Sequence, residues 1–112
     1  MKEVNLFKIY ISFSEIIEDI VVLEEEVGLF KAKIIFKNKT VLRIFQNSIN
    51  SKYSFFWLNQ KEKLITGWDN APHHKEISSF PDHKHIGNKV FVSKEKSLIQ
   101  VLKFIKKKIQ NN

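Results

Sequence analysis

The sequence predicts an α+β domain with an antiparallel β-sheet of about five strands in meander order, a C-terminal helix and a short N-terminal helix. Between residues 17 and 68, apolar residues recur with the two-residue period of half-buried strands, and polar turns separate the runs. Near the end of the chain, the apolar spacing becomes that of an amphipathic helix. A chain of 112 residues fits one domain, and we expect a single domain over residues 1–112.

Residues 4–13 fit a short amphipathic helix about as well as a strand, and we favour the helix. Residues 17–27 alternate raggedly and predict the first strand, with the acidic run 24–26 at its exposed end. Residues 30–36 alternate regularly between apolar positions and mainly lysines, which makes this second strand the clearest element in the sequence.

A polar break separates the second strand from a third at residues 41–44, so these two strands should pair as an antiparallel hairpin. Residues 53–58 are aromatic and alternating, and residues 64–68 can return as a fifth strand after a turn at residues 59–63. These strands then form an antiparallel meander.

Between Trp68 and Val90 the apolar residues follow neither the period of a strand nor that of a helix. We therefore expect an irregular loop that carries all four histidines. Long irregular loops in compact domains are usually functional or disordered, and the apolar residues within this one argue for order. The last helix should begin near Ser93. Its apolar face would consist of Leu98, Val101, Leu102 and Ile105.

The composition excludes several classes of protein. With 43% apolar and 28% charged residues, three glycines and two prolines, the chain is neither collagen-like nor disordered. The lack of cysteine excludes disulfides and thiolate zinc sites, so a metal would need histidine and carboxylate ligands. No export signal or membrane-spanning apolar run is recognisable, and we expect a cytoplasmic protein without a membrane partner.

The net charge of +7 and the sequence pI of about 9.6 favour a phosphate-bearing partner. The charge is unevenly distributed, because the acidic run 24–26 lies early and lysines crowd the end of the chain. These lysines are Lys103, Lys106, Lys107 and Lys108. This basic end is either a nucleic-acid contact or a solvated helix end, and the sequence leaves both open.

All four histidines lie between Trp68 and His85, near two lysines and two aspartates. The imidazole side chain has a pKa of about 6.5, close to neutral pH, so one histidine can accept a proton while another donates one. RNA cleavage uses such a pair, because a base deprotonates the ribose 2′-hydroxyl that attacks phosphorus and an acid protonates the departing 5′-oxygen. A lysine can stabilise the added negative charge. This interpretation requires neither a metal nor another cofactor.

Two other interpretations compete with catalysis. In an extended segment, His83 and His85 share a face and could hold a metal. The other candidate ligands are His73, His74, Asp69 and Asp82. Alternatively, the segment is a surface loop whose polar residues are hydrogen-bonded and unreactive. The aromatic run 53–57 also has two interpretations. Alternate residues of a strand point to opposite faces, so one set of rings can form core while the other set stacks bases. The sequence does not say which set is exposed.

Three motifs resemble the signature of the TumE-type toxins of prokaryotic toxin-antitoxin systems. They are YSFFW at residues 53–57, WDNAPHH at residues 68–74 and FPDHKH at residues 80–85. The likeness is strongest over residues 52–86 and extends loosely over residues 16–104. It implies a small cytoplasmic toxin that a cognate antitoxin binds and silences, and an RNA-cleaving activity. Two positions depart from the pattern, since Lys75 replaces a common proline and Asp82 replaces a common histidine.

We therefore expect the toxin of a toxin-antitoxin system, acting as a metal-independent endoribonuclease without a cofactor. Its expected partners are RNA and the cognate antitoxin, in a homodimer or a hetero-oligomer with the antitoxin. The expected catalytic residues are His73, His74, His83, Lys84, His85 and Asp69. The expected RNA contacts are Lys75, Tyr53, Trp57 and Trp68.

Among the catalytic residues, His83 or His85 would be the base and His74 the acid. Lys84 would stabilise charge, and Asp69 would orient an imidazole. The alternative is a non-catalytic, basic partner-binding protein, or a metal-binding domain with histidine ligands. A metal would then be held by His73, His74, His83 and His85.

Overall fold

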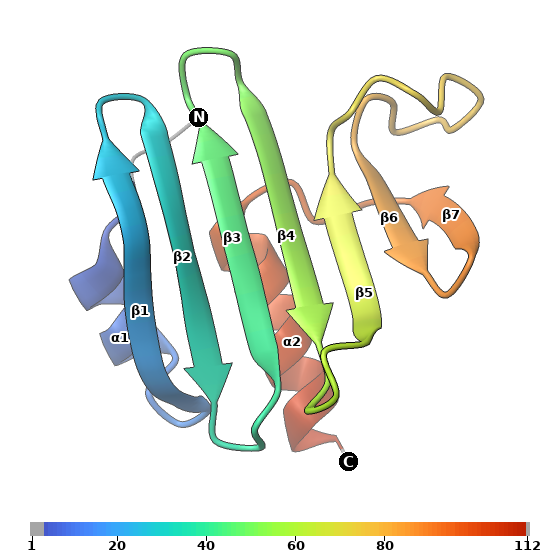
Figure 1. Cartoon of the computed structure of the whole chain (residues 1–112). Helices are drawn as coiled ribbons and strands as arrows, with labels where there is room; N and C mark the ends of the chain where they lie inside the picture. Colours follow the sequence, from blue (N-terminus) through green and yellow to red (C-terminus); the bar gives the residue numbers. More distant parts are fainter. Residues whose placement is uncertain (1–3, 112) are drawn as a thin grey trace.

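The computed structural model describes residues 4–111 and shows an antiparallel sheet with both of its helices behind one face (Figure 1). The seven strands lie in chain order across the sheet, so every strand pairs with its neighbours in sequence. The elements are α1 (Leu6–Ser12), β1 (Ile17–Glu26), β2 (Leu29–Phe36), β3 (Val41–Asn47), β4 (Lys52–Leu58), β5 (Leu64–Asp69), β6 (His83–Ile86), β7 (Lys89–Val92) and α2 (Leu98–Gln110). The predicted α+β class, the meander and both helices are confirmed.

The strand count of about five was too low, because β6 and β7 occupy part of the segment predicted to be an irregular loop. These strands have four residues each, which is too short for a clear alternation. A two-residue turn joins them at Gly87 and Asn88, and Gly87 adopts a positive φ of 60°. Glycine followed by asparagine is a hairpin signal, and it marks the two strands that the periodicity did not reveal.

Helix α2 begins at Leu98, later than the predicted start near Ser93. Ser93 is buried, with its backbone N–H donating to Ser79 Oγ and its hydroxyl donating to the backbone oxygen of Glu95. These bonds hold residues 93–96 outside the helix. The side chain of Ser97 then caps α2 by accepting from the backbone N–H of Gln100.

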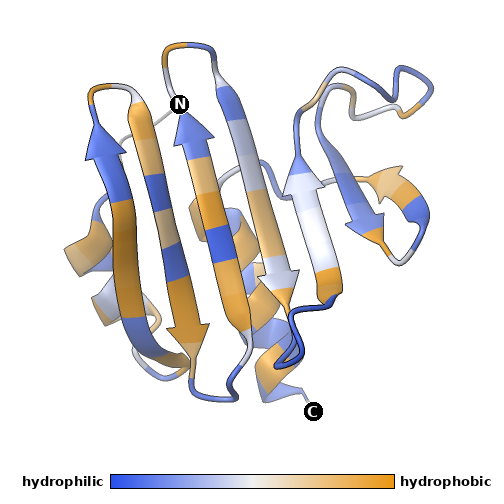
Figure 2. Cartoon of the chain, viewed as in Figure 1, coloured by the Kyte–Doolittle hydropathy of each residue, from blue (hydrophilic) through white to orange (hydrophobic). Residues whose placement is uncertain are grey.

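The core lies between the sheet and the two helices. Alternate strand residues point toward the helices, and the buried residues of the strands include Ile34, Phe36, Leu42, Ile44, Phe55 and Trp68. Four residues of α2 that share one face complete this core: Leu98, Val101, Leu102 and Ile105. Figure 2 shows this amphipathic pattern as alternating apolar and polar bands along β2 and β3.

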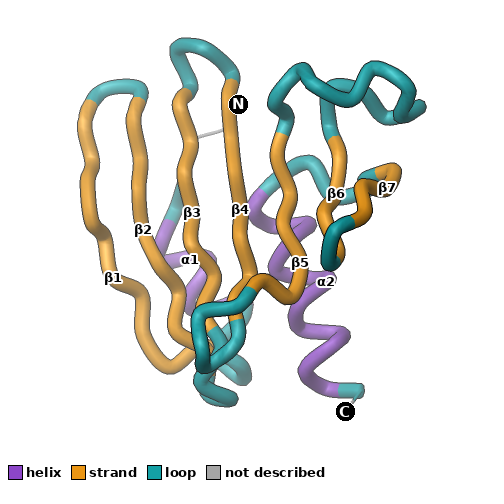
Figure 3. Tube along the Cα trace, turned by 45° about the vertical axis from the view of Figure 1, so that its right-hand side comes forward, coloured by secondary structure: helices purple, strands orange, loops and turns teal. Residues whose placement is uncertain are grey.

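The opposite face of the sheet is not covered by either helix (Figure 3). We call it the outer face. It carries the other strand parity, which is partly or fully exposed on β2 and β3 at Lys31, Lys33, Arg43 and Phe45. Neither helix within residues 4–111 has the length and apolarity needed to cross a bilayer.

Replacing Leu102, which is fully buried on α2, should destabilise the protein far more than replacing its exposed neighbour Lys103. Leu102→Ala should lower the free energy of unfolding by about 2–5 kcal/mol, because it removes buried methyl groups and leaves a cavity. Lys103→Ala should change it by less than about 0.5 kcal/mol. Urea denaturation measures both values, and equal losses would contradict the position of α2.

Candidate active site

The pairing of β5 with β6 brings Asp69 opposite His83 and Gly67 opposite His85. Paired residues of an antiparallel sheet project on the same side, and so do residues two apart on one strand. His83, His85 and Asp69 therefore share the outer face. The expected common face of His83 and His85 is confirmed, although they lie on a strand and not, as predicted, on an irregular loop.

The carboxylate of Asp69 connects both histidines. Its Oδ1 lies 3.0 Å from Nε2 of His83, and its Oδ2 lies 3.2 Å from Nε2 of His85. Oδ1 also accepts a hydrogen bond of 2.9 Å from the backbone N–H of Ala71. Both oxygens of one carboxylate are thus used, and this fixes the orientation of two imidazole rings.

His83 is held on both sides. Its Nδ1 lies 3.0 Å from the backbone oxygen of Pro81, and only 2% of the residue is exposed. A carbonyl oxygen can only accept, so Nδ1 carries a proton, while Nε2 faces the accepting carboxylate of Asp69. Both contacts are hydrogen bonds when both ring nitrogens are protonated. His83 therefore has no nitrogen directed at a ligand.

His85 and His74 differ from His83 in this respect. When Nε2 of His85 donates to Asp69, its Nδ1 has the lone pair, and no hydrogen bond within residues 4–111 occupies that nitrogen. Nδ1 of His74 lies 3.4 Å from Glu76 Oε1, which leaves its Nε2 available. Their side chains are 29% and 31% exposed, so a ligand can reach both.

His74 reaches this cluster from the loop of residues 70–82 between β5 and β6. Its ring centroid lies 4.8 Å from that of His83 and 5.9 Å from that of His85. The loop begins at Asn70, whose side chain accepts from the backbone N–H of Tyr53 and donates to the backbone oxygen of Ser51. Asn70 thus attaches the start of the loop to β4.

Two expected catalytic residues lie apart from this cluster. His73 is exposed, and the group of close histidines contains His74, His83 and His85 without it. Lys84 alternates to the opposite face, where its Nζ lies 3.3 Å from Glu95 Oε1 and 5.1 Å from the ring centroid of Phe104. Lys84 therefore faces α2, and its charge is paired there.

The residues expected to contact RNA also lie outside the cluster of His74, His83 and His85. Tyr53 and Trp57 are 6% exposed and Trp68 is fully buried, so none offers a free ring face to a base. Trp68 donates from Nε1 to Glu95 Oε1 and packs edge-on against Phe104. Lys75 lies exposed on the loop of residues 70–82.

Within residues 4–111, no hydrogen bond or ion pair joins the side chain of Asp82 to a histidine. Its Oδ1 accepts a hydrogen bond of 2.6 Å from the hydroxyl of Tyr53. Burial raises the pKa of that hydroxyl, and so do the hydrogen bond to Asp82 and the negative charges of Asp82 and Asp69. Tyr53 therefore stays protonated as a donor. The aspartate at position 82, where the family pattern commonly has histidine, therefore removes no residue from the cluster of His74, His83 and His85.

The three clustered histidines could also approach a metal ion, because one nitrogen from each lies within 4.8 Å of the others. Tetrahedral zinc with bonds of 2.0–2.1 Å would place ligand nitrogens about 3.4 Å apart. The rings would have to move inward, and His83 would have to give up its bond to Pro81 or to Asp69.

Sequence reasoning missed the roles of Pro81 and Gly67. The Pro81 backbone oxygen orients His83, and a backbone contact of this kind leaves no sequence signal. Gly67 lies on the outer face, where an added Cβ would lie 2.7 Å from Cδ1 of Phe56. A glycine inside a strand can signal such a close approach, so this contact could have been anticipated.

The TumE toxin family, described as "Toxin TumE", matches residues 7–110. The chain belongs to the TumE toxin family. The match spans α1 to the end of α2 and includes the whole histidine cluster. No curated protein and no solved structure gives a significant match. Membership makes the protein a toxin and implies a cognate antitoxin as its partner.

Asp69→Asn should break the sharing of one carboxylate between two histidines. The amide oxygen can still accept from one ring, but the amide nitrogen would direct a donor at the other donor. We expect the free energy of unfolding to fall by about 1–3 kcal/mol. The measurement is urea denaturation at neutral pH.

Asp82→Asn is the matched control, because its amide oxygen can still accept from Tyr53. It should cost less than about 1 kcal/mol. A loss for Asp82→Asn as large as that for Asp69→Asn would contradict the special role given to Asp69.

Proposed function

We propose that this TumE toxin is an endoribonuclease that needs no metal and uses His85 as the base and His74 as the acid. One observation supports this most strongly: Asp69 holds His85 through Nε2, which leaves Nδ1 as a proton acceptor on a ring whose centroid lies 5.9 Å from that of His74. One nitrogen from each ring lies within 4.8 Å of the other, close enough for both to reach one phosphodiester group.

The reaction follows from these positions. Nδ1 of His85 takes the proton of a ribose 2′-hydroxyl, and the 2′-oxygen attacks the adjacent phosphorus. The bond from phosphorus to the 5′-oxygen breaks as protonated His74 donates a proton to that oxygen. The products are a 2′,3′-cyclic phosphate and a free 5′-hydroxyl. At the end His85 carries the proton that His74 has lost, and exchange with water restores both.

Asp69 and His83 have positioning roles in this proposal. Asp69 selects the tautomer of His85 and favours the imidazolium that forms when His85 gains a proton. His83 is buried, and its two ring nitrogens each lie 3.0 Å from an oxygen atom, of Pro81 and of Asp69, so that it keeps the other carboxylate oxygen in place. The nucleophile is the 2′-hydroxyl of the substrate, so the proposed substrate is RNA rather than DNA.

A metal-binding function is the second candidate, because three histidine nitrogens converge in one place. It differs from the first in what it requires of His83, which would have to exchange a hydrogen bond for a metal bond. It also predicts that cleavage or partner binding is lost in chelator and restored by one kind of ion.

His85→Ala should reduce RNA cleavage by about a hundredfold or more, because it removes the base. His73→Ala should retain cleavage within about twofold of the wild type, because His73 lies outside the cluster. The assay incubates purified protein with single-stranded RNA in chelator and quantifies fragments over time. A thermal unfolding curve for each variant confirms that it is folded.

Three results would count against this proposal. Intact RNA with the wild-type protein would remove the nuclease function, and equal cleavage by His85→Ala would remove its base. Cleavage that requires an added divalent ion would favour the metal-binding alternative.

A further inference from the structure

The strand register connects the histidine cluster to a basic part of the outer face. Lys33 pairs with Arg43, Arg43 with Phe56, Phe56 with Gly67, and Gly67 with His85. Paired residues project on the same side, so these five residues form one row across β2 to β6. At about 4.8 Å per strand, the row spans about 19 Å.

A second row runs beside the first. It contains Lys31, Phe45, Ser54, Asp69 and His83, again by successive pairing. The two rows place cations on β2 and β3, aromatic rings on β3 and β4, and the catalytic histidine of the proposed function on β6. A pocket of about 330 Å³ lies over these strands, and its lining includes Lys31, Lys33, Arg43, Phe45 and Phe56 together with Leu23, Ala32, Ile44 and Ser54.

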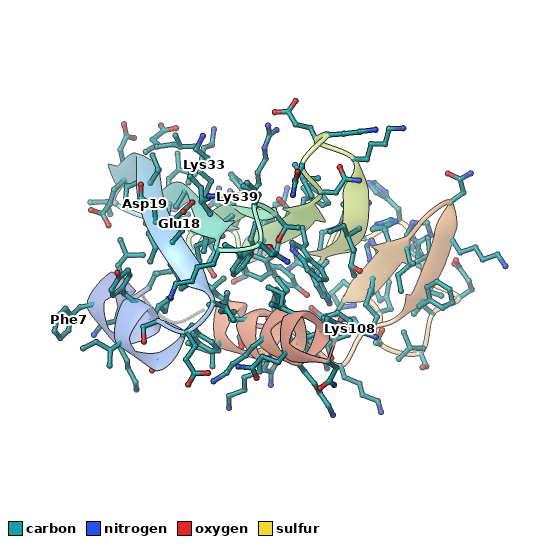
Figure 4. All side chains as sticks on the ribbon, turned by 90° about the horizontal axis from the view of Figure 1, so that it is seen from below. Phe7, Glu18, Asp19, Lys33, Lys39 and Lys108 are labelled. Atoms are coloured by element: carbon teal, nitrogen blue, oxygen red, sulfur yellow. The ribbon has the colours of Figure 1, made fainter. Side chains whose placement is uncertain are left out.

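The cations of this pocket are available to a ligand. The side chain of Arg43 is 59% exposed and meets Glu62 at 3.7 Å, and that of Lys31 is 45% exposed and meets Glu24 at 3.5 Å. Exposed ion pairs of this kind contribute little and exchange readily. No ion pair of Lys33 is found within residues 4–111, and Figure 4 shows this side chain on the side of the sheet away from α2.

Phe56 links the pocket to the histidines. Its ring approaches Gly67 so closely that an added Cβ there would lie 2.7 Å from Cδ1. The absence of a side chain at Gly67 therefore lets the ring lean toward β5, between Arg43 and His85 in the row. An aromatic ring on an open sheet face, next to cations, can stack one base of a single strand.

We propose that single-stranded RNA lies across the outer face, with Lys33 and Arg43 at its phosphates, Phe56 stacked on a base, and the cleaved bond at His85. This inference rests on the proposed function and names the binding surface for the same site. Two cations separated from the histidines by one aromatic ring match alternating phosphates and bases. Charge complementarity and continuity with the histidine cluster both favour RNA as the occupant.

The structure also distinguishes this surface from the lysine-rich end of α2. Lys33 and Lys39 project from the sheet side in Figure 4, whereas Lys108 lies on the helix side. The Nζ atom of Lys108 lies 5.5 Å from the ring centroid of Phe104, which is itself a residue of α2. Removing two lysines from α2 therefore changes the net charge without changing the outer face.

The test measures binding of a fluorescent 2′-O-methyl oligonucleotide, which cannot be cleaved by 2′-hydroxyl attack, at several salt concentrations. Lys33→Ala/Arg43→Ala should raise Kd about tenfold at low salt. The slope of log Kd against log salt should fall by about 1.4, or about 0.7 for each lost phosphate contact on a single strand. The charge-matched control Lys107→Ala/Lys108→Ala should stay within about twofold of the wild type.

Phe56→Leu adds a test that does not depend on charge. It should weaken binding about tenfold with an unchanged salt slope, because it removes a stacking ring but no phosphate contact. Since Phe56 packs on Gly67, a thermal unfolding curve must show that this variant is folded. If Phe56→Leu does not fold, the Lys33→Ala/Arg43→Ala variant still tests the inference.

Unchanged binding by Lys33→Ala/Arg43→Ala would overturn the inference and leave the outer face to a protein partner. Equal losses in both double variants would also overturn it, because binding would then follow net charge alone. Its failure is separable from that of the proposed function. If the wild type cleaves no RNA but the outer-face variant loses binding, the nuclease proposal fails and the RNA-binding surface stands.

Discussion

One oxygen of the Asp69 carboxylate lies 3.0 Å from Nε2 of His83 and the other lies 3.2 Å from Nε2 of His85, and the rest of the candidate site depends on this sharing. It fixes His83, which also donates to Pro81, so that His83 has no nitrogen left for a ligand. It leaves Nδ1 of His85 as the nitrogen that can accept a proton. In the proposed mechanism, one carboxylate gives two neighbouring histidines different roles, in the way that environment usually assigns acid and base functions.

The two faces of the sheet differ in what they carry, with the apolar core on one face and the candidate site on the other. The face toward the helices holds the apolar core, and even the charged Lys84 on that face is paired with Glu95. The outer face carries His83, His85, Asp69 and the pocket lined in part by Lys31, Lys33 and Arg43, and neither α1 nor α2 covers it. Because successive residues alternate between faces, the same short strand β6 contributes to both. A shift of one residue in its register would exchange Lys84 with the histidines.

The sequence alone predicted the fold class, because regular alternation identified β2 to β5 and helical spacing identified α2. It failed where elements are short, and β6 was hidden because four residues cannot establish a period. The clustering of histidines indicated the candidate site, but which set of alternate strand residues faces outward could not be assigned without the position of the helices. Trp57 was therefore expected to contact RNA, although it is buried. Its neighbour Phe56 points to the opposite face of the sheet and packs beside Gly67.

The chemical identity of the RNA ends tests the central claim most directly. Attack by the 2′-hydroxyl, with His85 as base and His74 as acid, leaves a 2′,3′-cyclic phosphate on one fragment and a 5′-hydroxyl on the other. Mass spectrometry of fragments produced in chelator distinguishes these ends from those of water attack. Cyclic phosphate ends that disappear with His85→Ala are the predicted result. Fragments that carry 3′-hydroxyl and 5′-phosphate ends would contradict the account.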